Sequence, residues 1–379
     1  MTSIEELTRW VKTHCPEELL GSTFRYGGGR QPMPDPAFRS WFDACRERGF
    51  TAPDWPEEYG GAGFNPLQAE ALGEVFRQTG APIPLVGAGK EMIGPLLLEM
   101  GTEDQKTRHL KRIASGELRW TQGYSEPGAG SDLASLQTRA IDNGDYYRVN
   151  GSKIWTSNAH MADWMFCLVR TNTEVAKQEG ISFVLIAMDD PGLVVQQIEL
   201  INGASQFCQV FFDDVRAYKN DLVGQENHGW TIAKRLLQIE RSAVGGGSFI
   251  PKSGPLPEVL KRYAPADPAA RDRVLQLEMR RASYQLTRQR AAAEQETPGA
   301  ATFATSSFKY LSSRLESAGL DTTVALMGSQ GLGWQGDTFS EEELTATRKM
   351  LLSKGYLIAG GSSEVQLNII AKRVLGLPD

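Results

Sequence analysis

Two short stretches of this chain combine residue types that could hold a ligand. The first reads Tyr124-Ser-Glu-Pro-Gly-Ala-Gly-Ser-Asp132 and follows a strand-like run that begins at Leu118. Its density of Gly, Pro and Ser disfavours a helix or a core strand, so we expect a loop. In such a loop, backbone N–H groups and small hydroxyls can come close to a flat or phosphorylated ligand.

The second stretch is Lys153-Ile-Trp-Thr-Ser-Asn158, which places an indole beside two hydroxyl side chains. An aromatic face next to hydrogen-bonding hydroxyls suits a planar ring system with polar edges. Taken singly, a Gly-rich loop is usually an ordinary turn and a strand Trp is usually part of a core. The two together, at this spacing, are more specific and indicate a binding site.

These stretches resemble the flavin-binding signatures of the acyl-CoA dehydrogenase family, which are close to T-E-P-x-A-G-S-D and W-[IT]-[ST]-N. The phrases P-E-E-Y-G-G at residues 56–61 and G-T-E-D-Q-K at residues 101–106 resemble the family's N-terminal helical domain. The resemblance implies FAD-dependent α,β-dehydrogenation of an acyl-CoA thioester. In that reaction a carboxylate removes an α-proton while the β-hydrogen leaves as hydride to N5 of FAD.

Carried over position by position, the resemblance also implies which residues contact the flavin. Near the C-terminus, Gly360-Gly-Ser-Ser-Glu-Val-Gln366 is similar to the family's E-G-T-S-E-I-Q phrase. Ser131 is expected close to the substrate as well as to the flavin. The expected cofactor-binding residues are Gln122, Tyr124, Ser125, Gly130, Ser131, Trp155, Thr156, Ser157, Ser362 and Glu364.

The catalytic base is where this chain departs from the commonest family pattern. The first residue of the C-terminal phrase is usually the catalytic glutamate, and here it is Gly360, which offers only its backbone N–H to polarise the thioester carbonyl. Some family members place the base on a C-terminal helix immediately before an arginine. That position is Glu240, followed by Arg241, so we expect Glu240 to be the base and Arg241 to lie near the substrate. The alternative is that both are solvated charges of a helix.

A second departure concerns the subunit assembly. The family's R-x-x-F-G phrase, which reaches the FAD of a neighbouring subunit, is absent after Arg241, although residues 327–333 resemble the second cross-subunit phrase, G-G-x-G-Y. In lacking this arginine, the chain resembles a divergent branch of the family that acts on bulky substrates, including steroid side-chain and dicarboxylic acyl-CoAs. Some of those enzymes are α2β2 heterotetramers in which one chain has lost the base or part of the FAD site. The sequence leaves several alternatives open: this chain is a complete subunit, a depleted subunit of a heteromer or part of a homo-oligomer, or it uses the same fold for other flavin chemistry. The expected electron acceptor is electron-transfer flavoprotein.

Composition limits the class of protein. Of the 379 residues, 41% are hydrophobic and 23% charged, and the net charge is −6, which argues against binding to nucleic acid. No apolar run approaches the roughly 20 residues of a membrane span, and the N-terminus lacks a secretory pattern. The scattered cysteines and histidines suggest no metal site. We therefore expect a cytoplasmic protein.

The periodicity predicts an α+β multidomain fold. Residues 1–117 and 223–379 read as helical, and residues 118–222 read as short strands of a small β-barrel or sandwich, which is also the architecture that the resemblance implies. Tight turns are expected at residues 142–145 and 149–152. The prolines between Pro255 and Pro268 predict an irregular passage. The expected helices include residues 66–79, 88–100, 231–244, 269–295, 302–326 and 364–374, with another beginning at Thr102.

Overall fold

The computed structural model describes residues 3–243, 252–295 and 305–378. The chain divides into two compact units. The first comprises Met1–Ile198 with Gln206–Glu240, and the second comprises Glu199–Ser205 with Arg241–Asp379. The division into domains at residues 117 and 222 stays a prediction.

The first unit begins with five helices, and in three of them a capping box marks the start. Capping boxes, in which a small polar side chain and a Glu or Gln three residues later satisfy each other's backbone N–H groups, pair Ser3 with Glu6, Asn65 with Gln68, and Thr102 with Gln105. The pair at Thr102 and the helix over residues 66–79 confirm the prediction. The helices are α1 (Ile4–His14), α2 (Pro36–Glu47), α3 (Pro66–Thr79), α4 (Gly94–Met100) and α5 (Glu103–Ala114).

The helix expected over residues 88–100 is divided. A wide π-type turn covers Gly89–Ile93, and α4 follows it with Pro95 in its first turn. Proline has no N–H to donate to the preceding turn, so the hydrogen-bond pattern changes just before it. Gly94 lies against the ring of the buried Trp55, where a Cβ would clash.

The middle of the chain forms one mixed sheet of seven strands. The strand order is β1-β4-β2-β3-β7-β6, with β5 antiparallel to β4. The β-rich middle region is confirmed, in the form of a single sheet. Its strands are β1 (Trp120–Gly123), β2 (Arg139–Asp142), β3 (Tyr146–Ser157), β4 (Trp164–Arg170), β5 (Ile181–Ala187), β6 (Leu193–Ile198) and β7 (Phe207–Tyr218).

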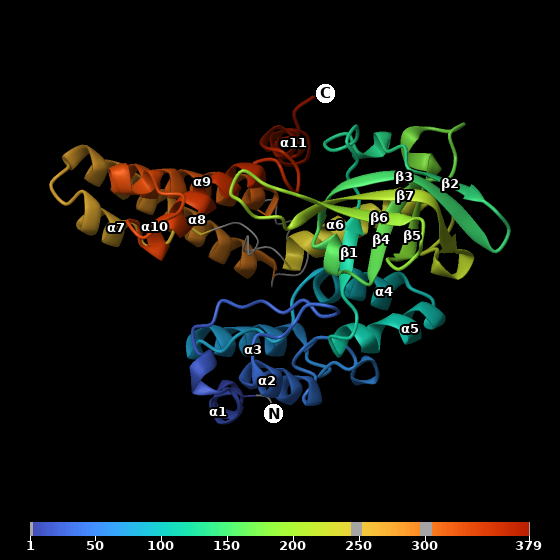
Figure 1. Ribbon diagram of the computed structural model, residues 1–379, viewed down its shortest axis with the longest axis horizontal. Coiled ribbons are helices and arrows are strands. Elements are labelled where there is room, and N and C mark those ends of the chain that lie inside the picture. Colours follow the sequence, from blue (N-terminus) through green and yellow to red (C-terminus); the bar gives the residue numbers. More distant parts are fainter. Residues whose placement is uncertain (1–2, 244–251, 296–304, 379) are drawn as a thin grey trace. The chain divides into compact units, whose positions relative to one another are not determined.

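Strand β4 is buried on both faces because its alternate side chains enter two different cores. Phe166 and Leu168 join a core that includes Trp55 from the loop after α2, Leu96 of α4, and Leu236 of α6 (Gly229–Ala243). The intervening side chains, Met165, Cys167 and Val169, lie in a second core within the sheet. Figure 1 shows α4 and α5 beside this part of the sheet. Because successive strand residues point to opposite faces, β4 contributes side chains to both cores.

Strand β3 shows one correct and one wrong turn prediction. The turn at residues 142–145 joins β2 to β3, with Gly144 at φ 83° and its N–H bonded to Asp142 Oδ1 at 2.9 Å. The turn predicted at residues 149–152 is wrong, because Asn150 and Gly151 lie inside β3 at a shift of register against β7. Gly151 has φ 145°, and across this shift one residue of β3 faces two residues of β7, so the extra residue belongs to β7 and β3 continues.

The second unit consists of helices α7 (Leu256–Tyr263), α8 (Pro268–Gln295), α9 (Thr305–Met327), α10 (Glu341–Tyr356) and α11 (Ser363–Ile369). In Figure 1 α8, α9 and α10 run alongside one another. The sequence reading missed α10, whose start is marked by a capping box of Ser340 and Glu343. It was wrong at α7, because two of the prolines expected to break a helix lie at its beginning, where the missing N–H costs nothing.

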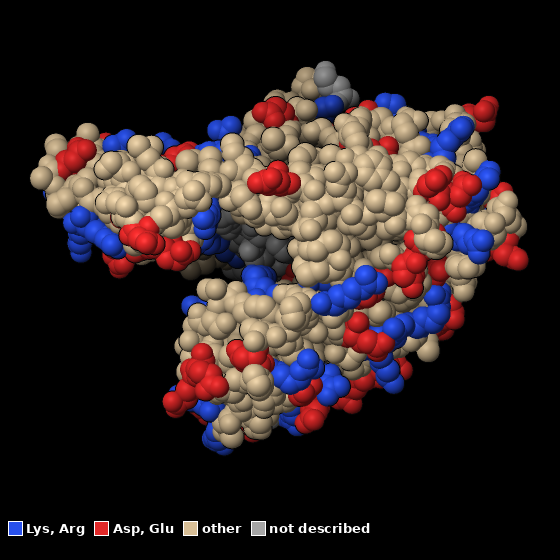
Figure 2. Space-filling model, in the orientation of Figure 1, with Lys and Arg blue, Asp and Glu red and all other residues tan. Residues whose placement is uncertain are grey.

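Figure 2 shows acidic and basic side chains interleaved on the visible face of the N-terminal helices. Ion pairs between neighbouring turns of the N-terminal helices include Arg77 with Glu74 and Arg108 with Asp104. Within the described ranges, no helix has both the length and the apolar character that a bilayer crossing requires.

Candidate functional site

The Gly-rich loop at residues 124–131 is fastened by a buried ion pair. Lys153 of β3 is fully buried, and its Nζ donates to Glu126 Oε1 at 2.7 Å and to the Tyr124 carbonyl at 3.1 Å. Glu126 also accepts the N–H groups of Gln137 at 2.6 Å and Thr138 at 2.9 Å. Burial alone would raise the pKa of Glu126, but Lys153 and these hydrogen bonds together lower it. The carboxylate therefore stays ionised and its oxygens are satisfied.

Trp155 lies in an irregular turn of β3 that exposes its indole. The register with β7 shifts between Lys153 and Thr156, so the two residues between them do not follow the regular pairing. The Ile154 N–H donates instead to the Ser125 carbonyl of the loop, at 2.8 Å. Trp155 has φ 61°, a left-handed conformation that is costly for a large side chain, and its side chain is 54% exposed. A strained backbone that holds an aromatic ring in solvent is typical of a binding site.

The polar groups expected beside the indole lie on the same strand end. Thr156 is buried, and its Oγ1 has no hydrogen-bond partner among the described residues. Ser157 is exposed, and its carbonyl accepts the Thr121 hydroxyl of β1 at 2.9 Å. Asn158 follows with φ 54°. The end of β1, the loop and the end of β3 therefore form one hydrogen-bonded assembly.

The loop offers its backbone and serines rather than the Tyr124 ring. That ring is buried edge-on against Phe166 and Phe183. Ser125 is partly exposed, while Gly130 and Ser131 are exposed, and a Cβ on Gly130 would meet no heavy atom within 4 Å. Gln122 lies on β1, paired with Phe166 of β4. The structure thus gathers the eight predicted cofactor-binding residues of the first unit around β1, the loop and β3.

The predicted base, Glu240, lies near the end of α6, and Arg241 follows it in the same helix. Both side chains lie outside the described residues. Earlier in α6, Arg235 forms a forked pair with Glu99 of α4, with Nε 2.8 Å from each carboxylate oxygen. This pair and the buried Leu236 hold the helix against its neighbours.

Gly360, Ser362 and Glu364 lie in the second unit. Gly360 and Gly361 have φ values of 69° and 95°, a conformation that favours glycine. Lys309 of α9 donates to the Gly361 carbonyl at 2.7 Å and to the Leu357 carbonyl at 3.4 Å, and Gln366 donates to the Gly360 carbonyl at 3.2 Å.

The end of this loop is a helix start. The Ser362 hydroxyl accepts the Val365 N–H at the beginning of α11. Glu364 is exposed, and its pKa is lowered by hydrogen bonds from its own N–H and from Ser362. Burial lowers the pKa of Lys309, although Glu364 opposes that change. The loop that carries Gly360 is therefore held by two side chains from within the same unit.

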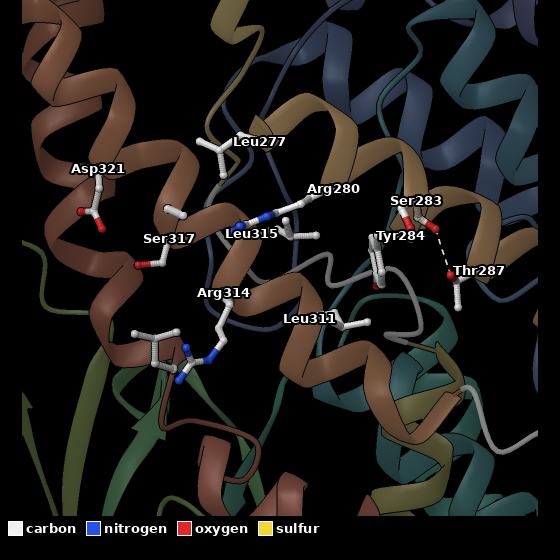
Figure 3. Close-up of a pocket in the computed structure, with 12 residues that line it drawn as sticks. Leu277, Arg280, Ser283, Tyr284, Thr287, Leu311, Arg314, Leu315, Ser317 and Asp321 are labelled. Carbon is white, nitrogen blue, oxygen red and sulfur yellow. Dashed lines mark hydrogen bonds between the residues drawn. The ribbon is translucent and has the colours of Figure 1, made fainter. Parts of the chain in front are cut away.

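A separate pocket of about 540 Å³ lies between α8 and α9. Figure 3 shows Arg280 and Arg314 near Leu277, Leu311 and Leu315, and the hydrogen bond from Thr287 to Ser283. None of the predicted site residues is among those that line it.

Three residues that support the predicted site residues could not be assigned this role from the sequence: Lys153, Glu126 and Lys309. Lys153 and Glu126 stand inside the quoted motifs, but the motifs did not show that the two side chains pair. A lysine and a glutamate inside otherwise small or apolar motifs were the available signal, since buried charges need partners. Lys309 carried no comparable signal, because a single lysine in a long helix is ordinarily solvated.

Comparison with known proteins agrees with this geometry. Family models of the acyl-CoA dehydrogenase N-terminal, middle and C-terminal domains match residues 30–117, 121–215 and 227–375. Acyl-CoA dehydrogenase IpdE1 of Mycobacterium tuberculosis is 34% identical over 391 residues, covering 100% of this chain and 99% of IpdE1. The chain belongs to the acyl-CoA dehydrogenase family.

Solved structures agree on the fold of this acyl-CoA dehydrogenase family member. The Tcur3481-Tcur3483 steroid ACAD has a TM-score of 0.78 at 26% identity, covering 99% of this chain and 96% of that chain. The ChsE4-ChsE5 complex from Mycobacterium tuberculosis has a TM-score of 0.76 at 26% identity, covering 99% and 97%. The predicted order of helical, β and helical regions is confirmed, and the chain is an oxidoreductase of a flavoprotein family.

Proposed function

We propose that this protein catalyses FAD-dependent α,β-dehydrogenation of an acyl-CoA thioester, with Glu240 as the base that removes the α-proton. The observation that carries the proposal is the exposed, strained Trp155 beside a loop of small residues fastened at Glu126. The buried Thr156 hydroxyl, which lacks a partner among the described residues, and the open side of Gly130 fit a polar-edged ring. FAD, when bound, would accept the hydride from the β-carbon.

The residues of the chain would divide the remaining work. Trp155, Thr156, Ser157, Ser125 and Ser131 would bind and orient the flavin, together with Gln122, Tyr124, Gly130, Ser362 and Glu364. The Gly360 N–H would donate to the thioester carbonyl, where negative charge develops as the α-proton leaves. Arg241 and Ser131 would contact the substrate. Glu240, as a carboxylate, would take the proton.

A bulky acyl group is the proposed substrate class, and electron-transfer flavoprotein is the proposed electron acceptor. One solved structure similar to this chain is titled a steroid ACAD. Gly360 has no side chain, and among the described residues a Cβ there would meet only Lys309 Cε, at 3.9 Å. This position therefore leaves space that a glutamate would otherwise take.

The proposal is tested by anaerobic titration of the purified protein with a panel of straight-chain, dicarboxylic and steroid side-chain acyl-CoAs. Loss of the flavin absorbance with one class would support it. A flavin that no acyl-CoA bleaches would contradict it. Reoxidation by electron-transfer flavoprotein rather than by O₂ would separate a dehydrogenase from an oxidase.

A second candidate is a partial subunit of a heteromeric dehydrogenase. It is favoured by the absence of an R-x-x-F-G phrase after Arg241 and by the similarity to a complex of two named chains, ChsE4-ChsE5. The flavin content of the chain purified alone separates the candidates. About one FAD per chain favours a complete subunit, and none favours a partial one that needs its partner.

A further inference from the structure

We propose that Lys153 and Glu126 are positioning residues that hold the Gly-rich loop and the Trp155 turn in a single geometry for the flavin. The inference rests on the proposed function, since it concerns the same site. Neither side chain would touch the ligand. Lys153 is fully buried, and only 7% of the Glu126 side chain is exposed.

Three contacts connect the strand to successive residues of the loop. Lys153 Nζ donates to the Tyr124 carbonyl, the Ile154 N–H donates to the Ser125 carbonyl, and Lys153 pairs with Glu126. The loop is thereby attached to the strand at three consecutive residues. The next residue of the strand is Trp155, so the two halves of the site share one set of contacts.

The irregular turn of β3 explains why this attachment is needed. Ile154 and Trp155 lie where the regular pairing with β7 is interrupted, and the Ile154 N–H is satisfied by the loop instead. A loop rich in glycine has many accessible conformations, so fixing it before the ligand arrives lowers the entropy cost of binding. The Glu126 carboxylate also fixes the far side of the loop through the Gln137 and Thr138 N–H groups.

The alternative is that the pair only stabilises the fold. Removing one member of a buried ion pair leaves an uncompensated charge, so Lys153→Met alone would also destabilise the protein. The double variant Lys153→Met/Glu126→Gln removes both charges while keeping most of the volume and one amide oxygen for the loop. It still removes the Lys153 donor to the Tyr124 carbonyl. Weaker FAD binding in a variant that has recovered stability would therefore indicate a positioning role.

Arg108→Met is the matched control. Arg108 pairs with Asp221 at 2.8 Å, and the Asp221 side chain is 5% exposed, close to the value for Glu126. The control leaves a buried carboxylate unpaired in the same unit, away from the loop. It should lower stability without changing the affinity for FAD.

The experiment measures three quantities on the full chain: urea unfolding, FAD affinity by quenching of flavin fluorescence, and hydrogen exchange of residues 124–131 without flavin. We expect the double variant to recover stability relative to Lys153→Met. Its Kd for FAD should rise about tenfold or more, the loss typical when groups supporting a binding site are removed. Its loop should exchange faster than in the parent.

Two results would overturn the inference. One is a double variant that binds FAD as tightly as the parent. The other is an unchanged exchange rate at residues 124–131 in both Lys153 variants. If the parent itself binds no FAD in any assembly state, the proposed function fails instead, and the exchange measurement still decides whether the pair fixes the loop.

Discussion

The imidazole of His109 meets the indole of Trp164 edge-on, with the ring centroids 4.7 Å apart. The same imidazole lies 5.0 Å from the ring of Trp120, in the strand that leads into the Gly-rich loop. Its Nδ1 has no hydrogen-bond partner among the described residues. Burial, and then the neighbouring Arg108, lower the pKa of His109 to about 4. This contact joins α5 to β1 and β4, and its burial disfavours the protonated ring.

Stability should therefore fall as the pH drops from about 6.5 to about 4. Over that interval the unfolded chain takes up a proton at His109 and the folded chain does not, which costs about 3 kcal/mol in total. His109→Gln should flatten the dependence of the urea midpoint on pH between 5 and 7. His160→Gln, at a less buried imidazole, should change it less. An unchanged slope in His109→Gln would contradict the assignment.

Substitutions of Trp155 should change FAD affinity and protein stability in different orders. Trp155→Gly relieves the left-handed backbone strain, whereas Trp155→Ala keeps it, so the Gly variant should be more stable than the Ala variant by about 1 kcal/mol. Both variants should bind FAD more weakly than the parent, and Trp155→Phe should bind at an intermediate level. Thermal unfolding and flavin fluorescence measure the two effects. Equal FAD affinity in all four proteins would remove the indole from the site.

Glu240→Gln should retain the yellow flavin but lose turnover by about 100-fold or more, because a neutral amide cannot accept the α-proton. Glu99→Gln is the control. Glu99 of α4 pairs with Arg235, which lies in the same helix as Glu240, and both side chains are half-exposed. Loss of this pair should therefore cost about 1 kcal/mol or less and leave turnover near the parent value. Full turnover in Glu240→Gln would exclude this residue as the base.

Lys309→Met should loosen the loop that carries Gly360. The carbonyls of Gly361 and Leu357 lose their donor, so hydrogen exchange at residues 357–361 should quicken. If the Gly360 N–H binds the thioester carbonyl, kcat should also fall by about 10- to 100-fold through misplacement. Lys354→Met, which breaks the contact of Lys354 in α10 with Asp321 in α9, should change neither. Slower turnover without faster exchange would place the role of Lys309 elsewhere.

The sequence alone determined the order of helical and β regions and indicated two stretches of the proposed site. Periodicity separated helical from β regions, because buried faces repeat every two residues in strands and about every 3.6 in helices. Capping pairs marked helix starts such as Thr102 with Gln105, since these contacts are local. The loop at residues 124–131 and a strand end with Trp155 beside hydroxyls were predicted from residue types, whereas the irregular turn at Trp155 was not.

Only the tertiary structure decided which side chains hold those motifs in place. The pairing of Lys153 with Glu126 joins residues that are 27 positions apart, and the hold of Lys309 on Gly361 spans 52 positions. Neither contact has a local pattern, because it depends on which strand and which helix the fold brings alongside. The wrong turn at Asn150 and Gly151 has the same cause. Its residue types suit a turn, but pairing with β7 keeps both residues inside the continuous strand β3.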